Sequence, residues 1–197
     1  MFALINEPLP GVRILEPYRS ADARGVFVKT YHKDFWLGAG LEFELKEEFF
    51  TVSKQGVIRG MHFQVPPHDH NKIVYCTSGA VLDVVLDIRR NSPTYGEYAA
   101  FLLTSARGIP DDQPADLRRY RRDAAVVYIP KGFAHGFMAV TDDSCLVYKT
   151  DAVYSPAHDS GIRWDSIGFD WPLSGSPEIS ERDQTFIPFS DFGSPFP

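Results

Sequence analysis

The run from Ala80 to Ile88 constrains the fold of this chain more than any other segment. Within it, Val81-Leu82-Asp83-Val84-Val85-Leu86-Asp87-Ile88 is apolar at nearly every position instead of at alternate positions. A strand with one face in water alternates apolar and polar residues, so a nearly continuous apolar run is typical of a strand buried on both faces. The rest of the chain must cover this strand from two sides, as in a β-sandwich or a small β-barrel.

Nine other segments have the composition of strands, and clusters of Gly, Pro, Asn and Asp separate them. They are residues 11–15, 25–31, 48–52, 57–63, 72–77, 95–103, 124–129, 136–140 and 144–149. Only residues 33–41 have the pattern of a short helix. Many short strands joined by turns predict an all-β fold, namely an antiparallel β-barrel or jelly roll with short peripheral helices.

The chain of 197 residues is long enough for one domain with a sizeable core and barely long enough for two. We expect a single domain over residues 1–197, with its core at about residues 10–173. Residues 105–123 are rich in Pro and Asp and then basic through Arg118-Arg119-Tyr120-Arg121-Arg122, which indicates a long surface excursion. Residues 174–197 have little strand pattern and are expected to lie over the barrel as a C-terminal tail.

The charge and cysteine content exclude several classes of protein. The formal net charge of −6 argues against a general nucleic-acid binder, although a few local Arg and Lys could hold one nucleotide. No stretch approaches the roughly 20 apolar residues of a membrane helix, and residues 1–10 lack the features of a signal peptide. Cys76 and Cys145 lie in apolar runs, so we expect buried thiols rather than a disulfide framework. These features predict a cytoplasmic location without a membrane partner.

A metal site is the first hypothesis for the histidines. His68-Asp69-His70 and the Pro-x-Gly-x-x-His run that ends at His135 resemble parts of the two cupin motifs, and imidazoles from neighbouring strands commonly bind transition metals. The first motif, however, needs a Glu a few residues after His70, where this chain has residues 71–75. Lys72 in that stretch would put a positive charge beside the metal. We therefore favour a site that holds no metal.

Metal-free proton transfer next to a carbonyl group is the second hypothesis. It needs a base, an acid on the opposite face of the substrate, and a cation or donor near the oxygen that becomes an enolate. His62, Tyr148 and Lys72 are suitable residue types at predicted strand positions. A carboxylate that holds the imidazole would fix its tautomer, and either Asp87 or Asp183 could supply it.

Several motifs, in order along residues 10–185, carry a family resemblance. The run Gly56-Val57-Ile58-Arg59-Gly60-Met61-His62-Phe63-Gln64 closely resembles the signature of the dTDP-4-dehydrorhamnose 3,5-epimerase family, which acts on nucleotide-linked 4-keto-6-deoxyhexoses. The agreement continues at Lys72-Ile73-Val74, Gly79, residues 83–89, Ser92-Pro93-Thr94-Tyr95-Gly96, residues 129–137, Tyr148-Lys149, Tyr154 and Asp170-Trp171-Pro172.

The resemblance implies a cupin-like jelly-roll homodimer that uses no metal and no organic cofactor. By position, His62 resembles the general base, Tyr148 the acid on the other face of the sugar, and Asp183 the carboxylate that orients the base. Lys72 would stabilise the enolate at C4, because a 4-ketone acidifies the protons at C3 and C5.

The resemblance also implies residues that bind the substrate. Arg59, Lys72 and His135 resemble the polar contacts to the keto-sugar and the diphosphate, and Tyr154 resembles an aromatic contact to the sugar or base. Arg24, Phe27 and Glu47 fall in two segments that help the family hold the nucleotide and sugar.

Those two segments depart from the family pattern. Arg-Gly-x-Phe-x-Glu becomes residues 24–29 with Lys29 in place of the acid, and Gln-x-Asn-x-Ser becomes Glu47-Glu48-Phe49-Phe50-Thr51. Carboxylate and phenyl groups lack the donors of the amides they replace, so the ligand cannot be held in the same way. The 105–123 excursion and the turn at residues 66–70 also differ from the family's usual form.

Because of these departures, CDP- and GDP-linked sugars stay open beside dTDP-linked ones, and so does inversion at a single carbon. A 3,4-keto-isomerase on a similar nucleotide sugar is the main alternative, followed by a metal-dependent cupin enzyme. A cupin that only binds a nucleotide sugar is disfavoured, because it has no need for an acid and a base together.

The spacing of Arg59 and His62 raises a geometric question. Residues three apart in a regular strand point to opposite faces of the sheet. We expect Gly60 to host a bulge or a strong twist that brings both side chains to one pocket.

Overall fold

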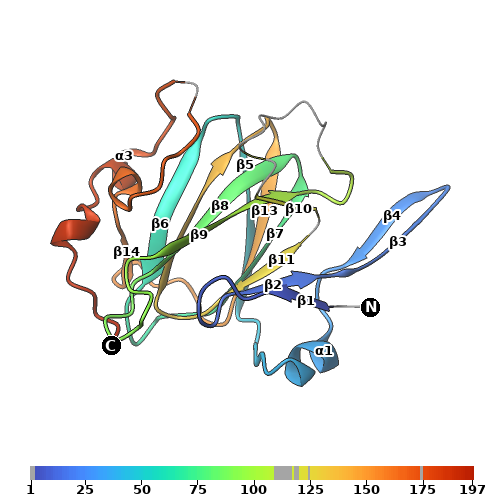
Figure 1. Ribbon diagram of the computed structural model, residues 1–197, viewed down its shortest axis with the longest axis horizontal. Helices are drawn as coiled ribbons and strands as arrows, with labels where there is room; N and C mark the ends of the chain where they lie inside the picture. Colours follow the sequence, from blue (N-terminus) through green and yellow to red (C-terminus); the bar gives the residue numbers. More distant parts are fainter. Residues whose placement is uncertain (1–2, 109–116, 118–119, 124, 174) are drawn as a thin grey trace.

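A computed structural model describes residues 3–108, 117, 120–123, 125–173 and 175–197. Two six-stranded sheets pack face to face, and a two-stranded hairpin projects from one end of them (Figure 1). This arrangement is the cupin-like jelly roll that the strand pattern and the resemblance predict.

The first sheet has the order β1 (Ala3–Asn6), β2 (Arg13–Glu16), β11 (Val126–Ile129), β7 (Lys72–Ser78), β13 (Ser144–Thr150) and β5 (Glu47–Ser53). The second sheet has the order β10 (Arg121–Asp123), β9 (Tyr98–Thr104), β8 (Ala80–Asp87), β12 (Phe133–Ala139), β6 (Ile58–Gln64) and β14 (Asp159–Gly161). Neighbouring strands are antiparallel except β10 and β9, which are parallel. The hairpin consists of β3 (Tyr18–Asp22) and β4 (Gly25–Lys29).

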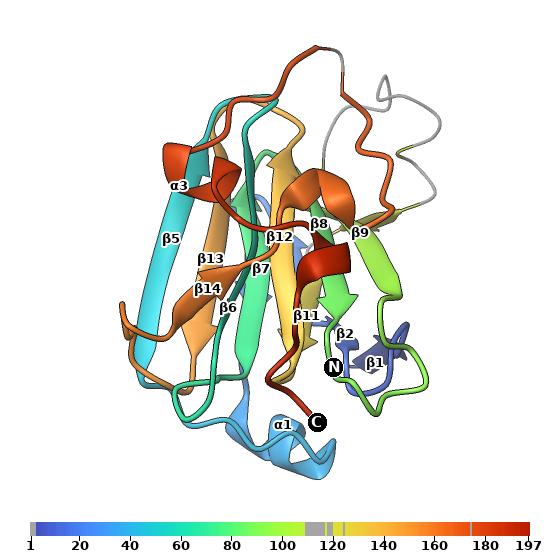
Figure 2. The ribbon, with the colours of Figure 1, turned by 90° about the vertical axis from the view of Figure 1, so that its left-hand side faces the viewer.

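Among the described residues, four short helical elements lie outside the sheets. They are α1 (Lys33–Gly38), α3 (Glu181–Gln184) and the 3₁₀ turns η1 (Trp164–Ser166) and η2 (Phe189–Asp191). Helix α1 places the fully buried Trp36 against Ile73 and Tyr128 on the outer face of the first sheet. Both α3 and η2 belong to the C-terminal segment, which passes in front of the second sheet in Figure 2.

Strand β8 is buried at every position, which confirms the prediction from its apolar run. Val81 and Val85 point between the sheets and pack with residues such as Val74 and Leu146 of the first sheet. Leu82, Val84 and Leu86 point the other way, toward Phe169, Trp171 and Phe196, which lie in residues 162–197, the segment that follows β14. The strand is apolar on both sides because one side faces the opposite sheet and the other faces residues from the segment after β14.

All ten predicted strands are present, with shifted ends. The strand expected at 136–140 begins at Phe133, and the one expected at 95–103 begins at Tyr98, because residues 92–97 form turns. The predicted helix ends at Gly38. Sequence reasoning missed β1, β3, β10 and β14. The first two are exposed throughout and have no buried face, and the others are three residues long.

Residues 105–123 and 174–197, the two segments without a strand pattern, contain short regular elements that the sequence did not predict. Within the predicted excursion, residues 109–116 and 118–119 lie outside the described part of the chain, and residues 121–123 form β10 beside β9. The C-terminal segment carries α3 and η2, and Phe196 belongs to the core. Cys76 is buried as predicted, whereas Cys145 is partly exposed; both are free thiols.

Candidate active site

A cavity of about 380 Å³ opens between the two sheets. Side chains from β5, β6, β7, β12 and β13, and from the segment after β13, line it. Seven of the ten site residues predicted from the sequence are among them: Glu47, Arg59, His62, Lys72, His135, Tyr148 and Tyr154. An eighth, Asp183, stands behind His62 in an adjoining pocket, whereas Arg24 and Phe27 lie elsewhere.

A β-bulge in β6 puts Arg59 and His62 in the same cavity. His135 pairs with His62 and Phe137 pairs with Arg59, so β6 has one residue more than β12 across this stretch. Gly60 has φ = 142°, and a Cβ on it would lie 2.5 Å from the Cα of Gly136. Glycine is therefore required at this close approach of the two strands, and the predicted bulge is confirmed.

His62 is held by a buried carboxylate. Its Nε2 lies 2.8 Å from Oδ1 of Asp183, and Oδ2 of Asp183 accepts a hydrogen bond of 3.2 Å from the Gly60 backbone N–H. Burial by itself would raise the Asp183 pKa, but the hydrogen bonds from His62, Gly60 and Ser180 outweigh it and lower the pKa. The charged carboxylate keeps a proton on Nε2 of the neutral ring, which leaves Nδ1 as the basic nitrogen.

Tyr148 lies on the opposite wall of the cavity, on β13. Its ring stacks on Phe49, with centroids 4.7 Å apart and an angle of 11°, and meets the edge of the His135 ring at 5.9 Å. Burial and, secondly, the charge of Asp83 raise the pKa of the phenol well above its usual value. Tyr148 therefore keeps its proton at neutral pH, and the raised pKa means that this proton passes only to a strongly basic partner.

Lys72 brings a positive charge into the cavity from β7. Its Nζ donates a hydrogen bond of 3.2 Å to the backbone carbonyl of His62, and both side chains line the cavity. Burial lowers the pKa of Lys72 to about 8, while Asp159 and Asp83 favour its charged form. A cation in this position can stabilise an enolate oxygen that forms beside His62.

A second histidine–carboxylate pair lies deeper in the cavity wall. Nε2 of His135 is 2.7 Å from Oδ2 of Asp83, and both side chains are almost completely buried. Asp83 is one of two carboxylates in the otherwise apolar run that forms β8. A buried carboxylate needs a polar partner, so an Asp within this apolar run could have indicated a buried ion pair or hydrogen bond at this position.

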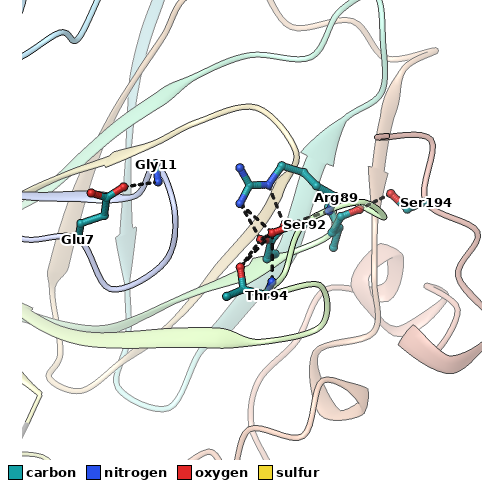
Figure 3. Close-up of polar contacts among 8 residues, drawn as sticks. Glu7, Gly11, Arg89, Ser92, Thr94 and Ser194 are labelled. Atoms are coloured by element: carbon teal, nitrogen blue, oxygen red, sulfur yellow. Dashed lines mark hydrogen bonds and ion pairs between the residues drawn. The ribbon is translucent and has the colours of Figure 1, made fainter.

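Asp87, the other carboxylate considered for His62, has a structural role instead. It accepts hydrogen bonds from Nη2 of Arg89 at 2.6 Å, Oγ of Ser92 at 2.6 Å and Oγ1 of Thr94 at 2.7 Å. Figure 3 shows these three residues gathered at one point. Ser194 hydrogen-bonds to the Ile88 carbonyl beside them, which anchors the end of the chain to β8. Asp183 alone of the two candidates orients His62.

Three polar residues lie at the rim of the cavity. The Nε of Arg59 donates to Oγ of Ser53 at 3.1 Å. The hydroxyl of Tyr154 donates to Asp159 at 3.0 Å, and its backbone N–H donates to Oε2 of Glu47 at 2.6 Å. Glu47 thus holds the segment that carries Tyr154, a role in which a carboxylate serves well. The ring of Tyr154 is 54% exposed and is available to a ligand.

Arg24 and Phe27 are not brought to this cavity within one chain. They lie in the β3–β4 hairpin, which projects away from the sheets (Figure 1). Phe27 is 55% exposed, and Arg24 forms an ion pair of 2.6 Å with Asp22 within the same hairpin.

Sequence reasoning also missed cavity residues that assist the predicted ones. Gln64 follows His62 by two positions on β6, so strand periodicity could have placed it on the same face. Asp159 contacts both Tyr154 and Arg182, the latter at 2.6 Å. Within the described ranges no cluster of three or more His, Cys, Asp or Glu has the geometry to hold a metal ion. No helix there is long and apolar enough to cross a membrane.

Comparisons with known proteins agree with this geometry. A family model described as dTDP-4-dehydrorhamnose 3,5-epimerase matches residues 6–109 and 116–191. The dTDP-4-dehydrorhamnose 3,5-epimerase of Methanothermobacter thermautotrophicus is 36% identical over 194 residues, which cover 96% of each chain. The dTDP-4-dehydrorhamnose 3-epimerase of Streptomyces niveus is 37% identical over 179 residues, which cover 89% of this chain and 78% of the relative.

A solved structure is similar over nearly the whole chain. It is that of dTDP-6-deoxy-D-glucose-3,5-epimerase from Legionella pneumophila in complex with dTDP-4-keto-L-rhamnose. The TM-score is 0.84 at 27% identity, with 98% of this chain and 95% of that chain covered.

Proposed function

The chain belongs to the dTDP-4-dehydrorhamnose 3,5-epimerase family, and from that premise we propose that its cavity epimerises a nucleotide-diphosphate-linked 4-keto-6-deoxyhexose. Inversion takes place at C3, C5 or both, beside the C4 ketone, as a step of deoxysugar biosynthesis. The relatives include a 3,5-epimerase from M. thermautotrophicus and a 3-epimerase from S. niveus, so inversion at one or two centres is compatible with the proposal.

The placement of His62 and Tyr148 on opposite walls carries the proposal. His62 is on β6 of the second sheet and Tyr148 is on β13 of the first, and both line the same cavity. A sugar bound between them presents one face to each side chain. Loss of a proton from one face and gain of a proton on the other inverts the carbon.

In the first step, Nδ1 of His62 takes the proton from C3 or C5. The C–H electron pair moves into the ring as an enolate, whose negative oxygen at C4 is stabilised by the ammonium group of Lys72. Asp183 then stabilises the imidazolium that has formed, because its charged Oδ1 lies 2.8 Å from Nε2.

In the second step, the Tyr148 hydroxyl donates its proton to the same carbon from the opposite face. The enolate electron pair forms the new C–H bond, and the O–H bond of Tyr148 breaks. The proton on His62 passes to solvent and the phenolate regains one from solvent, so each inverted carbon exchanges its proton once. These steps use no metal and no organic cofactor.

The nucleotide part of the substrate is assigned to the rim. We assign the diphosphate to Arg59, while the buried His135, beside Tyr148, is assigned to the sugar end of the cavity. Arg59 uses Nε for Ser53, and its two Nη groups make no hydrogen bond or ion pair with the described residues. Tyr154 is assigned a stacking contact with the sugar or the base, on a segment held by Glu47.

A homodimer would explain why Arg24 and Phe27 lie outside their own cavity. The projecting hairpin presents both residues to solvent, where a second copy of the chain could receive them. The outer face of β5 exposes Phe50 by 66% and Val52 by 52%, an apolar surface at the edge of the first sheet. We propose that two copies pack through this face and that each hairpin completes the partner's nucleotide site.

Mixing two inactive variants tests this arrangement. Arg24→Ala and His62→Ala damage different chains of a shared site, so half of the randomly mixed dimers hold one intact site, and the mixture regains about a quarter of wild-type activity. A monomer by light scattering, or a mixture that stays inactive after subunit exchange, would contradict the shared site.

Proton NMR in deuterium oxide tests the epimerase function. The enzyme is incubated with dTDP-, CDP- and GDP-linked 4-keto-6-deoxyhexoses, and deuterium entering at C3, C5 or both identifies the inverted carbons and the preferred nucleotide. His62→Ala is the control and is expected to abolish exchange. A 3,4-keto-isomerase would instead yield a 3-keto sugar. If no sugar in the panel exchanges, the epimerase proposal fails.

A further inference from the structure

The side-chain amide of Gln64 has a defined orientation. Its Oε1 accepts a hydrogen bond of 2.5 Å from the backbone N–H of Ser155, and its Nε2 donates one of 2.8 Å to the backbone carbonyl of His68. A backbone N–H can only donate and a carbonyl can only accept, so the oxygen and nitrogen of the amide cannot be exchanged. Gln64 is 4% exposed, which holds this arrangement away from water.

This orientation determines the tautomer of His70. The Nε2 of Gln64 lies 3.0 Å from Nδ1 of His70, and because Nε2 is a donor, Nδ1 must accept. In a neutral imidazole the proton is then on the other nitrogen, Nε2. Burial lowers the pKa of His70 to about 3, and the charge of Lys72 acts in the same direction, so the ring is neutral at physiological pH.

His70 lines the same cavity as Lys72, His135 and Tyr148. Its Nδ1 faces the Gln64 wall, so Nε2, on the opposite side of the ring, is the nitrogen left for a ligand. Among the described residues, the ring hydrogen-bonds with Gln64 at Nδ1 and with the backbone of His68, whose carbonyl also accepts from Nε2 of Gln64. A neutral ring adds a donor beside Lys72 without adding a second positive charge that would repel the ammonium group.

We propose that His70 is a substrate-contacting residue whose Nε2–H donates a hydrogen bond to an oxygen of the keto-sugar, beside Lys72. The inference rests on the proposed epimerase function and adds a specificity contact at the sugar end of its site. From the sequence, His70 is a candidate only for a metal ligand. The reacting groups His62, Lys72 and Tyr148 share this cavity, which favours a sugar oxygen over a phosphate oxygen as the acceptor.

The tautomer is tested by long-range ¹H–¹⁵N correlation NMR on the resting enzyme. We expect protonated Nε2 and unprotonated Nδ1 on His70 from pH 5 to pH 9. A proton on Nδ1, or a doubly protonated ring in that range, would overturn the proposal. This readout does not depend on any substrate.

The contact is tested with three variants in the exchange assay, using the nucleotide sugar that the wild-type enzyme accepts. Loss of a hydrogen bond to a charged or polarised oxygen predicts that His70→Leu lowers kcat/KM by about 10- to 100-fold. His70→Gln keeps an N–H donor and is expected to recover most of that loss. His68→Leu is the matched control, because the His68 side chain stacks on His158 outside the cavity.

Inhibition by the free nucleoside diphosphate separates a sugar contact from a phosphate contact. The inhibition constant is expected to be the same for wild type and His70→Leu, because the inhibitor lacks the sugar. A weakened inhibition constant would assign His70 to phosphate and overturn the proposal, as would wild-type kinetics in His70→Leu. If the wild-type enzyme exchanges no sugar, the proposed function itself fails, whereas unchanged kinetics in His70→Leu refute only this contact.

Discussion

Replacing Asp183 by Asn changes the tautomer of His62 while leaving the shape of the side chain almost the same. In the native site one carboxylate oxygen accepts from Gly60 N–H and the other faces Nε2 of His62. The Gly60 N–H is a fixed donor, so the Asn oxygen must turn toward it. The Asn amide then points its own N–H groups at His62. Nε2 becomes an acceptor, and the ring proton moves to Nδ1.

A proton on Nδ1 removes the basic nitrogen from the side of the ring that faces the cavity. General base catalysis is typically worth about 10²- to 10⁴-fold, so we expect exchange to slow by about that factor, a rise in barrier of about 2.7–5.5 kcal/mol. Stability should change by less than about 1 kcal/mol, because each hydrogen bond of Asp183 has a replacement in the Asn variant. Activity and stability are thus expected to separate.

The assay measures deuterium incorporation at C3 and C5, together with thermal unfolding by circular dichroism. Imidazole ¹⁵N shifts of His62 report the tautomer directly. Asp165→Asn is the control, since Asp165 forms a surface ion pair of 2.6 Å with Arg163, away from the cavity. If Asp183→Asn is folded and keeps more than about a tenth of wild-type exchange, Asp183 does not set the state of the base, and the reasoning is refuted.

Two further predictions concern the cavity residues Tyr148 and Lys72, and a third concerns the buried Asp87 at the end of β8. Tyr148→Phe should still exchange the substrate proton but epimerise poorly, because the acid on the opposite face is gone; full turnover by NMR would contradict that role. Lys72 is protonated below its pKa of about 8, so kcat should fall as pH rises through 8, and Lys72→Arg should abolish this fall; a flat profile to pH 10 in the wild-type enzyme would count against the cation. Asp87→Asn should leave the exchange chemistry intact but lower the free energy of unfolding by about 3 kcal/mol, because it breaks the ion pair between the buried Asp87 carboxylate and Arg89. Calorimetry should then show a decrease in Tm of roughly 6–12 °C. A Tm within about 2 °C of wild type would mean that this ion pair contributes little to stability.

The strands were predictable where burial imposes a pattern. The continuous apolar run at 80–88 and the alternating runs around it gave the all-β fold, because a buried face restricts residue type at every second position or at every position. The exposed strands β1 and β3 were missed for the same reason: their hydrogen bonds are made by the backbone, and water accepts any side chain on both faces. The choice of partner strands was not readable from local patterns.

Much of the candidate site could also be anticipated, because motifs preserve the residue types that the chemistry needs. The sequence predicts His62, Lys72 and Tyr148 as a set, and the structure brings them to one cavity. The role of each stays a prediction until the variants are measured. The positions of Arg24 and Phe27 could not be anticipated, since the hairpin that carries them points away from its own cavity.

The sequence by itself predicted the class of fold, a candidate set of proton-transfer residues and a bulge at Gly60. Each of these leaves a local mark: a period of burial, a motif, or a residue without a side chain. The family resemblance implied Asp183 rather than Asp87 as the partner of His62, but only the tertiary structure brought the two side chains into contact, and only it joined Gln64 to His70. Asp183 is 121 residues from His62 along the chain, and a hydrogen bond over such a distance depends on how sheets and tail pack, which no local pattern encodes.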